Sequence, residues 1–449
     1  MVVINTPSPD GQKGPHAMRR IAPSDQIKQM IANLLQRGLE SQDAPADTLL
    51  RLGAQLLIQE VLEQEVTDFL GRERYERRQP GQPRMGYRNG YEPGCIRSTE
   101  VEILLQVPQV RDATEPYRSK AKDVLGGRTD VLERLAVQMY TRGLSTRDIE
   151  DAFRDATGEC LLSRSAVSEL TEVLWEEYQA FCERDLSEIE VEYLFLDAVY
   201  ESLRREGGVK EGVLCAWAIC SDGSKVMIHV ALGNKERYED WLNFLRDLVR
   251  RGLRTPVLIT SDGAPGLIRA VKEVWGNALR QRCLAHKIRN VLDKVPDSAR
   301  DDVKRAVQSA YYAPNQEIAE AIATDVLKKY QDLYPSAMKC FMDDWEASIA
   351  YLRCPSAHHK YIRTTNLLER SFLEERRRTK VIPRFFSEKS CLKLVFATLW
   401  QASQRWRRVK MTEFERQQLR RLRSELGLPP IPPNAGRSTE GREEFRIAA

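Results

Sequence analysis

The stretch Val257-Leu-Ile-Thr-Ser-Asp-Gly263 places an aspartate and a glycine directly after a short apolar run that is typical of a buried strand. A second apolar run, Val191-Glu-Tyr-Leu-Phe-Leu196, is also followed by an aspartate, Asp197. Side chains that follow the strands of an open α/β sheet gather at one edge of that sheet. We therefore expect Asp197 and Asp262 to end two strands and to point toward a common centre.

The residues around these two runs predict an α/β domain. Their spacing indicates three antiparallel strands, a helix, a strand, a helix and a final strand. The second and third strands are joined by Ser221-Asp-Gly-Ser224, which contains the Asp-Gly pair favoured in hairpin turns. This is the element order of a ribonuclease H-like core. The mostly helical residues 284–362 would interrupt that core before two further helices over 366–404.

A third carboxylate, Glu369, opens a predicted helix that is dense in arginine. Helical spacing places Phe372 and Leu373 three and four residues further on, so we expect Glu369 to share the inward face of this helix. Glu374 and Glu375 fall off that face, and we expect them to pair with the arginines that follow.

Two aspartates on strands and a glutamate on a helix suit a phosphoryl-transfer site. Two metal ions about 4 Å apart can clamp the attacking and leaving oxygens of a phosphodiester. Carboxylates supply the hard oxygen ligands that Mg²⁺ prefers. We therefore expect Asp197, Asp262 and Glu369 to be catalytic and to bind two Mg²⁺ ions, for which Mn²⁺ would substitute. Asp222 lies between two strands and is interpreted as a turn residue.

Cys283-Leu-Ala-His286 is a second local constellation. It could begin a zinc site that Cys354 with His358 or His359 completes. We favour a buried thiol beside a hydrogen-bonded histidine, because a free cysteine usually acts as a small hydrophobic residue. A third interpretation places His286 near the carboxylates, where it would position a phosphate or a water.

The overall charge is nearly balanced, with 69 Lys and Arg against 65 Asp and Glu in 449 residues, so the location of the basic residues matters more than their number. Residues 71–98 predict an extended basic loop, and residues 101–107 a strand. Residues 129–182 predict three helices compatible with a helix-turn-helix, with a plain bundle or dimerisation element as the alternative. The basic residues expected to contact DNA are Arg72, Arg74, Arg77, Arg78, Arg84, Arg88, Arg147, Arg164, Arg376, Arg377, Arg378 and Lys380.

Composition also restricts the class of protein. No apolar stretch approaches the roughly 18 residues of a membrane span, and we expect no signal peptide, because residues 1–14 have no apolar core. Nine irregularly spaced cysteines favour reduced thiols. We expect a cytoplasmic protein.

The length predicts two or three domains. Their expected segments are a disordered N-terminus at 1–23, a helical and basic end-binding region at 24–127, a helix-turn-helix-like DNA-binding domain at 128–185, the first part of the core at 188–285, a helical insertion at 286–362, the second part of the core at 363–405 and a basic C-terminal tail at 406–449.

Collinear blocks between about Val61 and Trp406 resemble the insertion-sequence transposases of the Mutator superfamily. The blocks are Gly86-Tyr-Arg-Asn-Gly-Tyr91, Val107-Pro108 with Arg111-Asp112, Leu196-Asp-Ala198, Val257-Leu-Ile-Thr-Ser-Asp-Gly263, Gln281-Arg-Cys-Leu-Ala-His-Lys-Ile-Arg-Asn290, Thr364-Thr-Asn-Leu-Leu-Glu369 and Arg376-Arg-Arg-Thr-Lys380. Together and in this order, they are highly specific.

The resemblance implies a ribonuclease H-like catalytic core with a helical insertion, preceded by mainly α-helical DNA-binding domains. It implies an Asp-Asp-Glu triad on Asp197, Asp262 and Glu369, and the family's Cys-x-x-His element on Cys283 and His286. It also implies binding to terminal inverted repeats, Mg²⁺-dependent cleavage at the ends of the element and strand transfer into double-stranded target DNA. It further implies a prokaryotic protein that is associated with the nucleoid when bound to DNA. Because two ends must be held together, we expect a homodimer or higher oligomer on DNA.

Two other classes remain open. One is a transposase-derived DNA-binding regulator that no longer catalyses. The other is a ribonuclease H-like nuclease that acts without strand transfer.

Overall fold

The structure is a computed structural model with two compact units. It describes residues 21–37, 45–76, 86–99, 102–125, 127–154, 160–203, 210–233, 237–380, 382, 385 and 387–430. The first unit takes residues 1–135 with 150–163, and the second takes residues 136–149 with 164–449. The expected disordered segment 1–23 lies outside the described residues up to position 20, and its last residue, Pro23, begins the first helix.

The first unit is a helical pair packed on a two-stranded sheet. Its elements are α1 (Pro23–Arg37), α2 (Pro45–Leu70), β1 (Tyr87–Arg97), β2 (Glu102–Arg111) and α3 (Lys120–Leu125). β1 and β2 are antiparallel, and Leu62 of α2 packs against Ile96 and Leu105 of the strands. The Gln59 side-chain amide hydrogen-bonds both the N–H and the C=O of Gln106, which fastens α2 to the backbone of β2. The strand expected over 101–107 is confirmed by β2.

The prediction of an extended loop over 71–98 is wrong for residues 87–97, which form strand β1. The sheet accommodates the glycines that suggested a loop. Gly90 has φ +83° and lies in the irregular register between Arg88 and Tyr91, as in a β-bulge. A Cβ on Gly94 would lie 2.9 Å from Val107 on the facing strand, so the close approach of the two strands requires glycine there.

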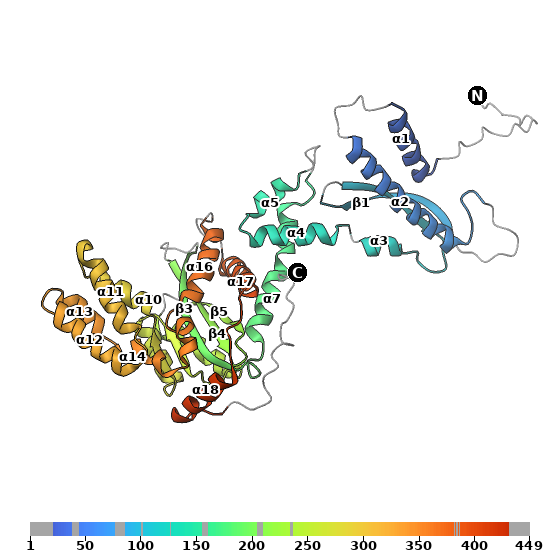
Figure 1. Cartoon of the computed structure of the whole chain (residues 1–449). Helices are drawn as coiled ribbons and strands as arrows, with labels where there is room; N and C mark the ends of the chain where they lie inside the picture. The colour runs from blue at the N-terminus through green and yellow to red at the C-terminus, as the bar shows by residue number, and fades with distance from the viewer. Residues whose placement is uncertain are drawn as a thin grey trace, which may run out of the picture. The chain divides into compact units, whose positions relative to one another are not determined.

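The second unit is built on a five-stranded mixed sheet (Figure 1). Its strands are β3 (Val191–Ser202), β4 (Lys210–Cys220), β5 (Lys225–Gly233), β6 (Leu258–Ser261) and β7 (Leu279–Arg282). The order is β5-β4-β3-β6-β7, with β3, β4 and β5 antiparallel and with β6 and β7 parallel to β3. The predicted α/β class and element order are confirmed, including the hairpin turn, where Gly223 has φ +81°.

Alternating side chains of β3 face two different cores. Leu194 and Leu196 pack with α8 (Tyr238–Arg250) and α9 (Pro265–Val274) on one face. Tyr193 and Phe195 face the other core, with α7 (Glu172–Glu183), α10 (Leu284–Leu292), α16 (Asn366–Thr379) and α17 (Glu388–Gln404). Burial on both faces explains the continuous apolar run of this central strand.

A helical insertion separates β7 from α16, as predicted for residues 284–362, and is drawn in yellow to orange in Figure 1. Beyond α10, its helices are η1 (Asp297–Ala299), α11 (Arg300–Tyr311), α12 (Gln316–Tyr330), α13 (Pro335–Met342), α14 (Trp345–Ile349), η2 (Ala350–Arg353), η3 (Ser356–His358) and α15 (His359–Ile362). The buried Gln281 amide of β7 donates to Ser348 O (3.0 Å) and accepts from Tyr351 N (2.8 Å), so it ties the insertion to the sheet.

The helices predicted over 129–182 are α4 (Asp130–Thr141), α5 (Thr146–Ala152), α6 (Arg164–Leu170) and α7. The capping box before α5 is confirmed, because Ser145 and Asp148 exchange hydrogen bonds of 3.0 and 3.1 Å. The prediction of one continuous third helix is wrong, since the chain breaks at Thr171. The second half, α7, buries Leu174 and Phe181 in the core of the second unit.

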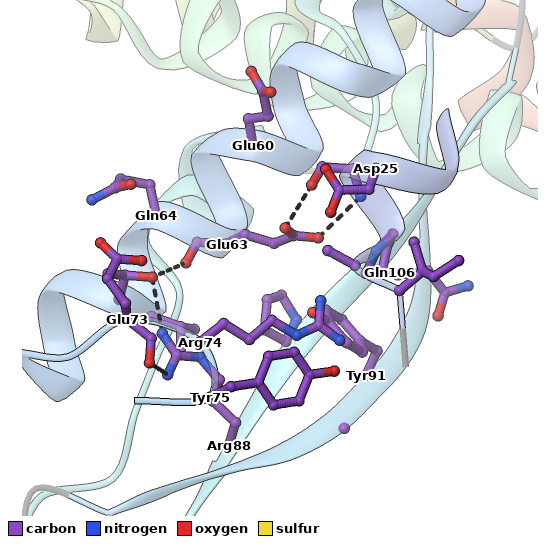
Figure 2. A pocket seen from close by; sticks show the side chains of 18 of the residues that line it. Asp25, Glu60, Glu63, Gln64, Glu73, Arg74, Tyr75, Arg88, Tyr91 and Gln106 are labelled. Atoms are coloured by element: carbon purple, nitrogen blue, oxygen red, sulfur yellow. Dashed lines mark hydrogen bonds between the residues drawn. The ribbon is translucent and has the colours of Figure 1, made fainter. Parts of the chain in front are cut away.

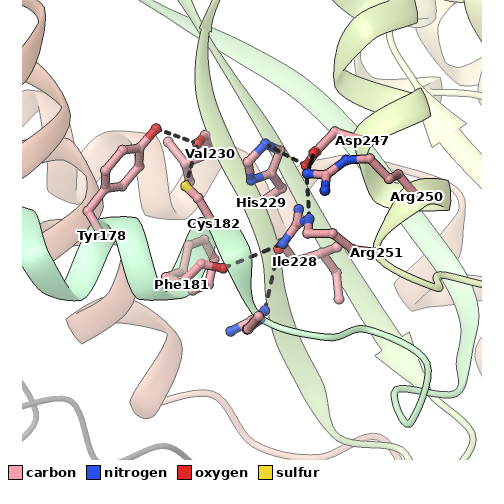
Figure 3. A network of polar contacts seen from close by, with 10 residues as sticks. Tyr178, Phe181, Cys182, Ile228, His229, Val230, Asp247, Arg250 and Arg251 are labelled. Carbon is pink, nitrogen blue, oxygen red and sulfur yellow. Dashed lines mark hydrogen bonds and ion pairs between the residues drawn. The ribbon is translucent and has the colours of Figure 1, made fainter.

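Side chains of α7 cover the edge strand β5 (Figure 3). Tyr178 donates to Val230 O (3.1 Å), and Arg184 donates to Met227 O (2.5 Å). On α8, Asp247 accepts from Arg251 Nε (2.8 Å) and lies 3.6 Å from the imidazole of His229. Burial, and then the Arg251 charge, lower the pKa of His229, so the arginine carries the positive charge of this network. Both helices are thereby fastened to β5.

The C-terminal segment predicted as a basic tail contains a packed helix, α18 (Glu413–Glu425). Leu419 and Leu422 are buried in the core of the second unit. Arg423 donates to Glu192 (3.1 Å) and to Thr255 O (2.8 Å), and its side chain is only 3% exposed. The few apolar residues between the arginines hid this helix from the sequence pattern. Residues 431–449 lie outside the described part of the chain.

We expect Arg423→Met to destabilise the folded protein by about 3–5 kcal/mol, because it leaves the buried Glu192 carboxylate without its partner. Urea denaturation would measure this. Arg421→Met, at an exposed position of the same helix, should change the free energy of unfolding by less than about 0.5 kcal/mol. Replacing Glu192 and Arg423 together by Met should recover most of the loss; equal effects of the two arginine changes would contradict the assignment.

Candidate active site

The two aspartates follow the end of the parallel pairing between β3 and β6. That pairing ends at Leu196 and Ser261, so Asp197 and Asp262 are the next residues on neighbouring segments. The expectation that Asp197 ends its strand is wrong. β3 continues to Ser202, because β4 still pairs with it beyond that point. Asp262 follows the last residue of β6, as predicted.

The Asp197 carboxyl is largely buried, at 9% exposure, and accepts a hydrogen bond from the Ala198 amide (2.9 Å). Burial raises the pKa of Asp197 to about 7, and the charge of Asp262 acts in the same direction. The His286 cation and a hydrogen bond with Thr365 oppose this rise. The carboxyl therefore lies in a place where added positive charge would favour its ionised form.

His286 and Cys283 connect the aspartates to Glu369. His286 Nε2 lies 3.5 Å from Glu369 Oε1. The hydrogen bond with Cys283, together with the charges of Asp197 and Glu369, raises the pKa of His286 to about 9. Although burial raises the pKa of the Cys283 thiol, its hydrogen bond with His286 lowers the pKa overall. The structure therefore places His286 near the carboxylates, as the third interpretation of this element had it.

The helical insertion leaves the sheet and returns to it at the same place. Thr260 of β6 donates to Ile362 O (2.7 Å) at the end of the insertion. The buried Cys283 Sγ accepts from both the amide and the hydroxyl of Thr365 at 3.3 Å. These bonds fix the residues that precede α16, and so bring Glu369 toward the edge of the sheet that carries the aspartates.

The other residues of the possible zinc site have different partners. His358 Nδ1 hydrogen-bonds the Tyr193 hydroxyl (2.7 Å), and His359 Nε2 lies 2.9 Å from the backbone oxygen of Cys354. Across the residues that the structure describes, no group of three or more His, Cys, Asp or Glu side chains is arranged to hold a metal ion. In this arrangement Glu369 is held by His286 rather than grouped with the two aspartates.

Helix α16 is oriented differently from the prediction. Phe372 is buried, as expected, but Leu373 is 53% exposed. Glu374 pairs with Arg377 (2.5 Å) and Arg378 (2.9 Å), as predicted. The expectation for Glu375 is wrong: it is fully buried, because the inward stripe of α16 consists of Leu368, Phe372, Glu375 and Thr379.

Glu375 faces a second buried carboxyl, Glu201 of β3. The Thr379 hydroxyl donates to Glu201 Oε1 (3.2 Å). Burial, and then the charge of Glu201, raise the pKa of Glu375 well above its usual range and so favour the protonated form of this carboxyl. The pair joins the helix that carries Glu369 to the strand that carries Asp197. Sequence reasoning missed it, since a glutamate beside arginines suggests a surface position.

Of the predicted DNA-contact residues in the first unit, Arg88 forms hydrogen bonds within the protein. It donates to Thr67 Oγ1 (2.9 Å), Arg72 O (2.9 Å) and Glu73 O (3.2 Å), and so holds the chain that follows α2. Arg72 donates to Gly86 O (2.6 Å). Burial lowers the pKa of Arg88, which agrees with a structural position.

Arg74 lies over the rings of Tyr75 (5.2 Å) and Tyr91 (5.9 Å) in a cavity of about 1810 Å³ (Figure 2). Carboxylates such as Glu60 and Glu63 also line this cavity, so its charge is mixed. Arg77, Arg78 and Arg84 lie outside the described residues.

The predicted DNA-contact residues of the second unit are mostly exposed. Those on its surface are Arg147, Arg164, Arg376, Arg377 and Lys380, whereas Arg378 is half-buried. A Cβ on Gly143 would lie 2.8 Å from Arg378 O, so the turn before α5 lies against the arginine-rich end of α16. These two basic segments, far apart in the sequence, therefore form one region.

Comparison with known proteins now identifies the family. The model of the family described as "Transposase, Mutator family" matches residues 26–409. The chain belongs to the Mutator family of transposases. As a transposase, it is a DNA-processing enzyme. No helix of the described residues is long and apolar enough to cross a membrane.

Transposases of several bacteria are similar to this one. The transposase of element ISRM5 from Rhizobium meliloti is 33% identical over 354 residues, covering 78% of this chain and 86% of the relative. That of IS406 from Burkholderia multivorans is 33% identical over 384 residues, covering 85% and 95%. That of IS256 in transposon Tn4001 from Staphylococcus aureus is 28% identical over 356 residues, covering 77% and 88%.

Glu375→Gln should stabilise this transposase increasingly as the pH rises. The pKa of Glu375 is higher in the folded state than in the unfolded state. Its contribution to the free energy of unfolding is therefore fully present below the pKa of the unfolded state, and it is lost as the pH rises toward the pKa of the folded state. The advantage of Gln should therefore grow by about 1.4 kcal/mol per pH unit above about pH 5.

Denaturation of both proteins between about pH 5 and about pH 8 would measure the difference. Glu374→Gln, at the neighbouring ion-paired position, should give no such growing advantage. A pH-independent difference between Glu375→Gln and the unmodified chain would contradict the raised pKa of Glu375.

Proposed function

We propose that this transposase binds the terminal inverted repeats of its insertion sequence and catalyses metal-dependent cleavage of DNA followed by strand transfer. The observation that carries the proposal is the meeting of Asp197 and Asp262 at the end of one parallel strand pair, with Glu369 brought to them through His286. A carboxylate pair on neighbouring strands and a helix-borne glutamate are the groups that phosphodiester chemistry with divalent ions needs.

We further propose that the second unit is a ribonuclease H-like core. The support is the strand order β5-β4-β3-β6-β7, with three antiparallel strands followed by two parallel ones, and a helical insertion before the helix of the third acid. The family's activity on DNA ends would then reside in this unit.

Asp197, Asp262 and Glu369 would hold Mg²⁺, with Mn²⁺ as a substitute. The chemistry of the donor set fits, because it consists of hard oxygens and because the burial of Asp197 beside Asp262 disfavours their negative charge. The three side chains would have to draw together around the ions. When bound, the ions would activate the attacking oxygen and stabilise the leaving one.

The surrounding residues orient these groups. The Ala264 amide donates to Asp262 Oδ1 (3.1 Å) at the start of α9, and the Ala198 amide fixes Asp197. His286 Nε2 holds Glu369 Oε1 and supplies positive charge to the acids. Since two ends must be joined in one reaction, we propose at least a dimer on DNA.

Asp197→Asn, Asp262→Asn and Glu369→Gln should each reduce cleavage and strand transfer by at least about 10³-fold, because residues that act as a unit fail together. The assay is a terminal-repeat duplex with Mg²⁺ or Mn²⁺. Glu374→Gln is the control, since its carboxylate pairs with Arg377 and Arg378 away from the site. An acid variant that cleaves normally would refute the site, and repeat binding by an unmodified chain that never cleaves would favour the DNA-binding regulator.

Arg376→Ala and Arg377→Ala should weaken binding to DNA of any sequence, because exposed arginines neutralise phosphates. Each lost phosphate contact should reduce the slope of log affinity against log salt by about 1. Binding titrations at several salt concentrations would measure the slope. Arg305→Ala, at an exposed position of the insertion, should leave it unchanged; equal slopes for all three variants would exclude α16 from the DNA interface.

A further inference from the structure

Gly263, the residue after Asp262, has a neighbour that any side chain at this position would displace. A Cβ added there would overlap the guanidinium of Arg282, and the three nearest atoms all belong to that group. The backbone of Gly263 does not lie in the left-handed region that favours glycine. A side chain at this position would therefore meet the Arg282 guanidinium and force it to move, whereas the turn itself does not call for glycine.

Arg282 is the last residue of β7 and is in register with Ser261 of β6. Its guanidinium therefore reaches the turn that begins at Asp262, next to the acids of the candidate active site. The side chain is partly buried, and its Nε is buried without a hydrogen-bond partner. Among the described residues, no carboxylate forms an ion pair with it.

Arg280, two residues earlier on the same strand, provides a direct comparison. It forms a two-pronged ion pair with Asp344, with Nη1 to Oδ2 at 2.7 Å. Arg282 lies within the electrostatic influence of Asp344, but the oxygens of that carboxylate are already taken by Arg280. The protein therefore supplies an acceptor for one arginine of β7 and leaves the other with donors to spare.

A phosphate is the acceptor that fits these donors. The planar guanidinium matches the oxygens of a phosphate, and arginine stays charged at all relevant pH values. A DNA strand at this site must bring its phosphates close to Asp197, Asp262 and Glu369, whose negative charges repel them. A cation against Gly263, the residue after Asp262, offsets part of that repulsion.

We propose that Arg282 binds a phosphate of the DNA strand held at the acidic site, and that Gly263 is glycine in order to leave space for its guanidinium. The inference rests on the proposed DNA-cleaving function. Gly263→Ala should therefore cleave DNA slowly because the added methyl group displaces Arg282, and not because it strains the turn.

The test is cleavage of a terminal-repeat duplex with Mg²⁺ by the full-length protein. Arg282→Ala and Gly263→Ala should each lower kcat by about 10²-fold, the loss typical of one preorganised donor. The double variant Gly263→Ala/Arg282→Ala should be no slower than Arg282→Ala, since the added methyl then meets no guanidinium. Arg282→Lys should recover part of the rate, because it keeps the charge but not the fork.

The unfolding midpoint should stay unchanged in Gly263→Ala, which separates a local role from loss of fold, and the salt slope of repeat binding should fall by no more than the one phosphate contact of Arg282. Full activity of Arg282→Ala, or a double variant slower by the product of the two single effects, would overturn the inference. If Arg282→Ala proves unstable, Gly263→Ala decides, and its normal cleavage would be a refutation.

Asp262→Asn in the same assay tests the proposed function separately. If Asp262→Asn is inactive and Arg282→Ala is fully active, the proposed role of Arg282 is refuted while the proposed function stands. Normal cleavage by Asp262→Asn would overturn the proposed function, and this inference with it.

Discussion

The arrangement of the candidate site depends on the point at which the parallel pairing of β3 with β6 ends. β3 pairs with β6 only as far as Leu196 and Ser261, yet continues to pair with β4 on its other side. Asp197 is therefore held by a strand while it faces a space that β6 has already left. Asp262 turns away from the same point toward α9. A carboxyl can be both rigid and accessible to neighbouring groups only at such a divergence, and the other site residues are arranged around it.

Buried polar bonds bring distant segments to this point. Gln281 joins β7 to Ser348 and Tyr351 near the end of the insertion, and Cys283 joins the start of α10 to Thr365. The Thr379 hydroxyl, which donates to Glu201, joins the far end of α16 to β3. Each bond links residues that are dozens of positions apart, so the helical insertion can vary in its interior without moving Glu369. Buried polar groups of this kind are costly when unpaired, which makes them specific for one arrangement.

The sequence is sufficient to predict an element where the residues next to it in the chain determine its structure. The Asp-Gly hairpin, the alternating run of β2 and the capping box at Ser145 and Asp148 depend on neighbours within a few residues, and each was predicted correctly. It was insufficient where a distant partner decides. Gly94 is tolerated in β1 only because β2 approaches it closely, and Arg423 is buried only because Glu192 receives it. In the candidate site, the positions of the three acids after strands and on a helix are enough to select them from the sequence. The positions of Glu375, Thr365 and Arg282 depend on contacts with distant segments, so only the tertiary structure shows them.

Both edges of the five-stranded sheet are already occupied. At β5, the carbonyls of Met227 and Val230 accept hydrogen bonds from α7. At β7, the side-chain amide of Gln281 bonds the backbone of Ser348 and Tyr351, so the insertion lies against this strand. A sheet whose outer strands are engaged in this way is a poor template for β-augmentation, the addition of a strand from another molecule. If copies of the protein assemble on two DNA ends, as we propose, we expect them to meet through helices, loops or the DNA itself rather than through this sheet.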